Sequence, residues 1–173
     1  LEMGSKNPLV VMDDADLNIA VACATNGAYG GTGQKCTASS RLIVHEKVYK
    51  EFTEKLIESI SALKVGHALE EGSQMGPVSS ETQLQSNLDY IEVGKKEAKL
   101  AYGGNPMNMR TPGYYMEPTL FIDGDNKSTI NQEEMFGPIA CVIPVKSYEE
   151  GLEVANDTIF GLSSGIVTQS LSK

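Results

Sequence analysis

The apolar residues of this 173-residue chain fall into two alternating patterns. Short continuous apolar runs at residues 7–12, 40–45 and 139–145 are typical of strands that are buried on both faces. Between these runs, apolar residues recur every three or four positions at residues 47–63 and 80–99. That spacing predicts amphipathic helices.

Weaker patterns complete the alternation. We expect further strands at residues 114–121 and 164–168, a short helix at residues 147–156, and a helix over residues 17–28. Three aspartates precede this last helix, where carboxylates accept backbone N–H bonds. Glycines and prolines predict a polar loop at residues 103–113. Strands that alternate with helices in this way predict one α/β domain, a three-layer α/β/α sandwich with a largely parallel sheet.

The composition excludes some classes of partner. The chain is 40% hydrophobic and 21% charged, which is enough apolar material for one core. Its net charge of -9 would repel nucleic acids and anionic membrane surfaces, so neither is expected as a partner. No apolar run approaches the roughly 20 residues that span a bilayer, and residues 1–6 do not resemble a secretory signal. We therefore expect a soluble, cytoplasmic protein.

The three cysteines differ in their surroundings. They are odd in number and widely spaced, which favours free thiols over a disulfide framework. Cys23 on a predicted helix and Cys141 on a predicted strand are expected to pack in the core. Cys36 ends a glycine-rich loop, where Lys35 and free backbone N–H groups could stabilise a nucleophilic thiolate. By local context alone, a small buried hydrophobe is an equally good interpretation of Cys36.

Other candidate motifs are incomplete. The glycine loop follows a helix and lacks the last glycine of G-x-G-x-x-G, and no phosphate-binding G-x-x-x-x-G-K-[ST] occurs. Asp14, Asp16 and Asn18 are spaced like the start of a calcium loop, but its later glycine and glutamate are missing. His45 and His67 are isolated, so no metal site is expected.

Three segments together resemble the aldehyde dehydrogenase superfamily. Residues 2–8 (EMGSKNP) resemble its glutamate motif E-L-G-G-K-[NS]-P, with Met3 and Ser5 as departures. Residues 33–41 (GQKCTASSR) are similar to its cysteine motif G-Q-x-C-x-[AS]-x-[ST]-R. Residues 133–138 (EEMFGP) match its cofactor motif E-E-[IM]-F-G-P. Order and spacing agree, and weaker matches cover essentially the whole chain.

The resemblance implies a role for four residues. Cys36 would attack the aldehyde and form first a thiohemiacetal and then a thioester, and Glu2 would activate the water that releases the acid. NAD or NADP would be the cofactor. Glu134 would accept hydrogen bonds from the nicotinamide ribose, and Phe136 would pack near the nicotinamide ring. We choose Glu134 over Glu133 because it lies two residues before Phe136, as in the family motif.

The resemblance also implies what the chain lacks. In the family, the dinucleotide-binding domain and a C-terminal oligomerisation segment lie outside the region that residues 1–173 resemble. We therefore expect a catalytic-domain fragment of a parent protein that is a homo-oligomer, and an isolated chain that binds NAD weakly and is nearly inactive. The residues around Glu2 and Cys36 look most like the branch that acts on semialdehydes such as 2-oxoglutarate semialdehyde.

Two other classes of function stay open. Cys36 and Glu2 could form a thiol esterase or acyl carrier that needs no nucleotide. Alternatively, the glycine loop could bind a partner protein and the cysteine could be inert. The reactivity of the Cys36 thiol separates these alternatives, because an activated nucleophile reacts faster than an ordinary cysteine.

Overall fold

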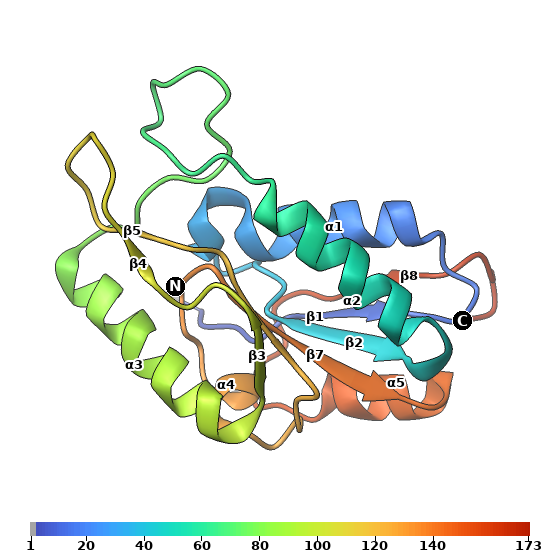
Figure 1. The fold of residues 1–173 in the computed structure, drawn as a ribbon. Coiled ribbons are helices and arrows are strands. Elements are labelled where there is room, and N and C mark those ends of the chain that lie inside the picture. The colour runs from blue at the N-terminus through green and yellow to red at the C-terminus, as the bar shows by residue number, and fades with distance from the viewer. Residues whose placement is uncertain (1–2) are drawn as a thin grey trace.

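The computed structural model describes residues 3–173 and contains a six-stranded sheet (Figure 1). Across the sheet the strands are β3 (Lys99–Tyr102), β6 (Thr119–Ile122), β7 (Ile139–Val145), β2 (Arg41–His45), β1 (Pro8–Val11) and β8 (Gly165–Val167). All neighbouring pairs are parallel except β3 and β6. A separate two-stranded ladder joins β4 (Pro106–Met107) to β5 (Tyr115–Met116).

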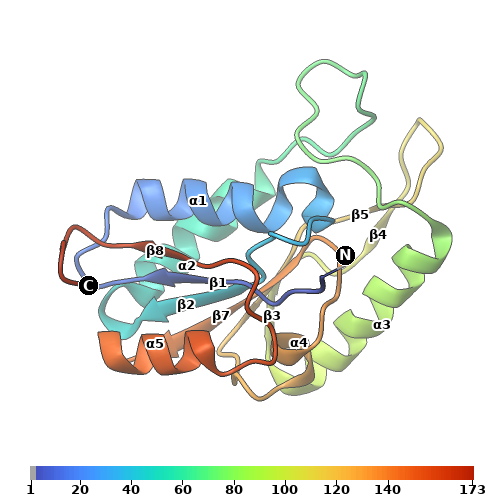
Figure 2. The same cartoon turned by 180° about the vertical axis from the view of Figure 1, so that it is seen from behind.

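Helices cover both faces of the sheet. Figures 1 and 2 show α1 (Leu17–Tyr29) and α2 (Glu46–Ser61) on one face, and α5 (Tyr148–Asn156) with the short α4 (Thr129–Gln132) on the other. The longer α3 (Glu81–Glu97) packs beside α4 and β3. The predicted three-layer α/β/α sandwich is therefore confirmed.

The alternation of side chains along β2 shows why both layers are needed. Leu42 and Val44 belong to the apolar cluster under α1 and α2, whereas Ile43 belongs to the cluster under α5. All three side chains are completely buried. Successive residues of a strand point to opposite faces, so an apolar run of this kind requires cover on both sides.

Several helices begin at a polar residue that binds free backbone N–H groups. The Asp16 carboxylate accepts from two N–H groups at the start of α1. The hydroxyls of Ser80 and Ser147 each accept one backbone N–H at the start of α3 and α5. Such side chains satisfy donors that have no partner inside the helix, which fixes where each helix starts.

Two expectations about local structure were wrong, and the end of one predicted helix differs by two residues. The strand expected at residues 114–121 is divided into β5 and β6, because Pro118 between them has no backbone N–H for a ladder bond. The helix expected at residues 80–99 ends at Glu97, and β3 follows it. The loop expected at residues 103–113 contains β4. Residues 129–132 (α4) and the 3-10 turn Gly30–Gly33 were not predicted.

Two cysteines test the predicted core. Cys141 on β7 is completely buried, as expected. The same expectation for Cys23 was wrong, because this residue lies on the exposed side of α1. Ala20, Ala24 and Ala28, spaced four residues apart, form the buried side of that helix.

Candidate active site

Four chain segments converge at one edge of the sheet. They are the segments that lead into four adjacent parallel strands: residues 3–7 (the β1 lead-in), 30–40 (the β2 lead-in), 133–138 (the β7 lead-in) and 157–164 (the β8 lead-in). Parallel neighbours have their amino ends on the same edge, so these lead-ins lie side by side (Figure 1).

A small cleft lies where three of the lead-ins meet. Ser5 of the β1 lead-in, Lys35 and Ala38 of the β2 lead-in, and Glu134 and Phe136 of the β7 lead-in all line it. These segments are far apart in the sequence, and each carries one of the three motifs noted above. The topology of the sheet therefore brings the three motifs to one place.

Cys36 lies on a turn of the β2 lead-in and is exposed. The Ala38 N–H donates to the Lys35 carbonyl at 3.0 Å and closes this turn. The neighbouring Lys35 side chain folds back over the glycine turn, where a Cβ added to Gly31 would lie 2.8 Å from Lys35 Cε. A cysteine in this position is accessible to small molecules, in contrast to Cys141.

The β2 lead-in depends on close packing at Gly33. This residue has a φ of 66°, which is the left-handed region that favours glycine. A Cβ at this position would overlap the carbonyl oxygen of Gly137 in the β7 lead-in. The backbones of the β2 lead-in, which carries Cys36, and the β7 lead-in, which carries Glu134, are thus in direct contact.

Glu134 faces the β1 lead-in. Its Oε1 accepts the Ser5 backbone N–H at 3.0 Å, and a Cβ added to Gly4 would lie 3.0 Å from its Oε2. Glu133 points elsewhere, because its carboxylate accepts the Tyr90 hydroxyl of α3 at 2.8 Å. Burial, followed by this hydrogen bond, raises the pKa of Tyr90. The two neighbouring glutamates therefore have different surroundings, and Glu134 is the one at the cleft.

Phe136 has an unusual combination of properties. Its φ is 51°, which a bulky residue rarely adopts, and its side chain is 38% exposed. A large apolar side chain held exposed on a strained backbone is common at binding sites.

The predicted base, Glu2, lies outside the described residues. The described part of its motif begins at Met3, which is 56% exposed. The following residues, Gly4 and Ser5, contact Glu134 as given above.

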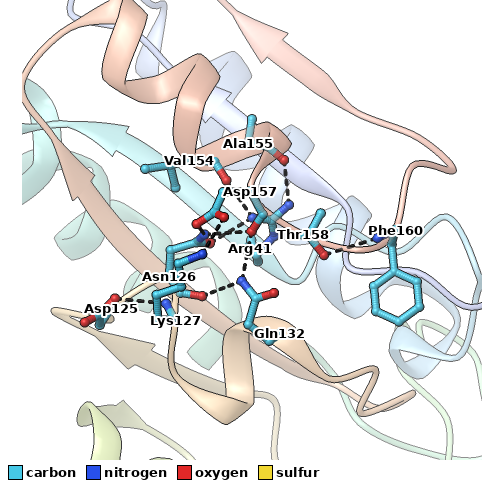
Figure 3. A network of polar contacts seen from close by, with 10 residues as sticks. All are labelled: Arg41, Asp125, Asn126, Lys127, Gln132, Val154, Ala155, Asp157, Thr158 and Phe160. Atoms are coloured by element: carbon cyan, nitrogen blue, oxygen red, sulfur yellow. Dashed lines mark hydrogen bonds and ion pairs between the residues drawn. The ribbon is translucent and has the colours of Figure 1, made fainter.

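A buried arginine, which was not singled out from the sequence, anchors the β1 lead-in, and Figure 3 shows its contacts with Asn126, Val154 and Ala155. The Arg41 side chain is completely buried, and its Nε donates to the Lys6 carbonyl at 2.8 Å. Its other nitrogens donate to the Asn126 side chain and to the carbonyls of Val154 and Ala155, all at 2.8 Å. Burial lowers the pKa of Arg41 to about 10, so the guanidinium stays charged at neutral pH.

This network extends to the β8 lead-in. The Asn126 amide nitrogen donates to the Asp157 carbonyl and carboxylate, at 3.0 and 2.9 Å. The Phe160 N–H donates to the Thr158 hydroxyl at 3.4 Å (Figure 3). The Phe160 ring in turn lies against Gly4, 3.1 Å from where a Cβ would be. Arg41 thus bonds directly to the β1 lead-in at the Lys6 carbonyl, and it is linked to the β8 lead-in through Asn126, which bonds to Asp157.

Lys6 is also buried, with 1% of its surface exposed. Among residues 3–173, no side chain or backbone group bonds to its ammonium nitrogen. Burial lowers the pKa of Lys6 to about 7, because the charged form loses its hydration. A second cavity, larger than the cleft described above, lies on the α5 side of the β1 lead-in. It is lined by Lys6, Asn7, Phe160 and Ser163, among others.

The sequence interpretation did not assign a role to the β8 lead-in. Its signal was present as a weak family match, but its place beside the β1 lead-in depends on β8 pairing with β1, whose paired residues are 156 positions apart in the chain. Within the described part of the chain, no three His, Cys, Asp or Glu side chains are grouped so that they could hold a metal ion. The helices of residues 3–173 include none that is long and apolar enough to cross a membrane.

Comparison with known sequences agrees with these motifs. The model of the aldehyde dehydrogenase family matches residues 1–173. The chain is 46% identical to the alpha-ketoglutaric semialdehyde dehydrogenase of Bacillus subtilis, over all of this chain and 36% of that protein. It is 42% identical to the 1-pyrroline-5-carboxylate dehydrogenase of Bacillus licheniformis, over 98% of this chain and 32% of that protein. The chain thus spans about a third of the length of these relatives.

Solved structures agree as well. The 1-pyrroline-5-carboxylate dehydrogenase from Thermus with bound NAD has a TM-score of 0.93 and 41% identity, over 98% of this chain and 32% of that one. The NAD+ complex of the aldehyde dehydrogenase from Bacillus cereus has a TM-score of 0.95 and 39% identity, over 99% and 35%. The family model matches this chain over all of residues 1–173, and the motifs and the fold agree with that match. The chain therefore belongs to the aldehyde dehydrogenase family.

Proposed function

We propose that this chain is the catalytic part of an NAD- or NADP-dependent aldehyde dehydrogenase, with Cys36 as the nucleophile and Glu2 as the general base. One observation carries the proposal. Cys36 is exposed on a turn of the β2 lead-in, and that lead-in shares a cleft with Glu134, Phe136 and the segment that follows Glu2. Membership of the family supports the same reaction class.

In this mechanism the Cys36 thiolate adds to the aldehyde carbon and forms a thiohemiacetal. Backbone N–H groups of the cysteine turn stabilise the charge on its oxygen. The nicotinamide cofactor supplies the acceptor for the hydrogen and the electron pair that leave this carbon. Cys36 then holds the acyl group as a thioester. Glu2 takes a proton from water, which attacks the thioester and releases the carboxylic acid and the thiolate.

The described residues fit a nicotinamide cofactor. The Glu134 carboxylate is turned toward the cleft and is a ready acceptor for ribose hydroxyls, with one oxygen already oriented by the Ser5 N–H. The exposed Phe136 ring offers an apolar surface to a flat nicotinamide ring. Relatives with bound NAD support the same assignment. An assay of the full-length enzyme with each cofactor distinguishes NAD from NADP.

We further propose that residues 1–173 form a catalytic domain, and that a dinucleotide-binding domain and an oligomerisation segment lie elsewhere in a homo-oligomeric parent. The relatives are about three times as long as this chain, which supports this division. The isolated chain should then bind NAD weakly and oxidise aldehydes negligibly, because most contacts to the cofactor would be missing.

The proposed substrate class is a semialdehyde such as 2-oxoglutarate semialdehyde. Relatives named for this substrate, from Bacillus subtilis and Haloferax volcanii, are 46% and 45% identical to the chain. Other relatives of similar identity are named for different substrates, including a betaine aldehyde dehydrogenase at 39%. The substrate therefore has to be measured.

The test is an assay of the full-length enzyme with a panel of semialdehydes and both cofactors, in which reduced cofactor is followed at its absorbance maximum. Cys36→Ser should abolish turnover, and Cys23→Ser should not change it, because Cys23 is exposed on α1 outside the cleft. Turnover that survives in Cys36→Ser would remove Cys36 from the mechanism. Ester hydrolysis by the wild type without cofactor, in the absence of any dehydrogenase activity, would indicate a thiol esterase instead.

A further inference from the structure

The side chain of Asn7 lies where three of the four lead-ins meet, and it is 2% exposed. Its amide nitrogen donates to the carbonyls of Cys36 at 2.8 Å and Ala38 at 2.9 Å. The same nitrogen is 2.9 Å from the Ser5 hydroxyl. On the other side, its amide oxygen accepts the backbone N–H of Ser163 at 3.0 Å. Asn7 thus joins the β1, β2 and β8 lead-ins.

These contacts determine the orientation of the amide. The nitrogen faces two carbonyl oxygens, which can only accept, and the oxygen faces an N–H group, which can only donate. An amide rotated by 180° would lose these bonds on both sides. The Asn7 carbonyl also accepts the Arg41 N–H at 3.3 Å, so the backbone of Asn7 is held in place as well.

The position of Cys36 depends on this amide. The carbonyls of Cys36 and Ala38 lie on either side of Thr37, so holding both of them fixes the peptide planes of the turn. An exposed thiol receives little support from packing, and its direction therefore follows the backbone. Because a shift of about 1 Å in a reacting group can cost on the order of 100-fold in rate, the orientation of this turn matters for catalysis.

We propose that Asn7 is a positioning residue, which holds the Cys36 turn through its amide nitrogen and couples it to the β8 lead-in through its amide oxygen. This inference rests on the nucleophilic role of Cys36 proposed above. Asn7 does not touch the reacting atoms, and it acts through the backbone of the residue that does. The β8 lead-in, which lines the cavity next to Asn7, thereby becomes part of the site.

Two substitutions separate the two sides of the amide. Asn7→Asp has nearly the same shape and keeps an oxygen for the Ser163 N–H, but it places a second oxygen against the carbonyls of Cys36 and Ala38. Asn7→Leu removes all four contacts without adding charge. The matched control is Asn131→Leu, which removes a completely buried asparagine whose amide nitrogen bonds to Asp125, Ser128 and the Cys141 thiol, so the folding of this variant is checked by circular dichroism and not by Cys141.

A timed labelling experiment with iodoacetamide tests the proposal, because the rate of alkylation can be measured separately at each of the three free cysteines by peptide analysis. Cys36 reports on the site, the exposed Cys23 supplies a reference thiol, and the completely buried Cys141 reports on unfolding. We expect both Asn7 variants to lower the ratio of Cys36 to Cys23 rate constants while Cys141 stays protected. The control should leave this ratio unchanged. An unchanged ratio in a folded Asn7→Leu chain would overturn the proposal.

The full-length enzyme supplies the second readout. We expect Asn7→Leu and Asn7→Asp to lower kcat on the order of 10-fold to 100-fold with little change in KM, because a misplaced turn slows the reaction of the bound substrate more than it weakens substrate binding. If the leucine variant unfolds and labels at Cys141, the aspartate variant decides. Equal losses in the Asn131→Leu control would mean a general effect on folding and would also overturn the proposal. Turnover that survives in Cys36→Ser refutes the proposed function instead, and the labelling ratio still tests Asn7.

Discussion

Replacement of Arg41 by methionine should strongly destabilise the fold. Methionine fills much of the same space and removes the guanidinium, which donates to four acceptors at 2.8 Å. Two of these acceptors, the Lys6 carbonyl and the Asn126 side-chain oxygen, belong to bonds that are fully buried. The other two are the carbonyls of Val154 and Ala155 in the last turn of α5, and the Val154 carbonyl also accepts the Asp157 N–H at 3.3 Å (Figure 3).

The two fully buried acceptors set the magnitude. A buried acceptor left without a partner costs about 1–3 kcal/mol, so the Lys6 carbonyl and Asn126 together cost about 2–6 kcal/mol. A domain of this kind has a free energy of unfolding of roughly 5–15 kcal/mol, so a large part of its stability would be lost. The partly exposed α5 carbonyls can turn to water, so they add less.

Urea denaturation of the 173-residue chain, followed by circular dichroism, measures this loss. Arg41→Lys is the informative comparison, because it keeps a charge but cannot reach acceptors on several sides with one flat group, and it should fall between wild type and Arg41→Met. Lys127→Ala is the control, since it removes only an exposed ion pair with Asp157 at the rim of the same network, and should change the midpoint little. A free energy of unfolding for Arg41→Met within about 1 kcal/mol of wild type would refute the reasoning, because a single buried acceptor left without a partner should cost at least that much.

Two further predictions concern Lys6 and Gly33. Lys6 has a pKa of about 7 in the folded chain, against an ordinary value of 10.5. Between these pH values the unfolded chain binds more protons than the folded chain, so the free energy of unfolding should rise with pH. Urea midpoints at pH 7, 8 and 9 should show this rise, and Lys6→Met should flatten it. Above pH 9 the raised pKa of buried Cys141 acts in the opposite direction, which limits the test to this window. Gly33→Ala should lower the melting temperature and disturb Cys36 labelling, because its Cβ would meet the Gly137 backbone, whereas Gly161→Ala has open space within 4 Å and should do neither. Equal effects of the two alanines would contradict the packing argument.

Local pattern was a good guide to the helices and buried strands of this chain, because those elements are determined by neighbouring residues. The predicted helix over residues 47–63 corresponds to α2, and the apolar run at residues 139–145 is β7. Burial on both faces of the sheet also followed, since continuous apolar runs require it. Errors occurred where a single residue changed the outcome, as at Pro118 between β5 and β6.

The site was predictable only in part, for a different reason. Cys36 and Glu134 could be chosen from their motifs, but Asn7, Arg41 and the β8 lead-in act through contacts between residues that are far apart in the chain. Those contacts depend on the order of the strands, which no local pattern of apolar residues specifies. Asn7 is a position of the glutamate motif and Arg41 ends the cysteine motif, but neither motif says which groups these side chains contact.

The location of the site at the amino ends of the strands has an electrostatic consequence. Ligands of open α/β sheets usually bind at the carboxyl ends, where helix amino termini offer partial positive charge. Here α1 and α5 end at the site edge, and helix carboxyl ends carry partial negative charge (Figure 1). A cation beside these helix ends offsets part of that charge. Arg41 binds the last carbonyls of α5, so its buried charge acts on this edge as well as on the fold.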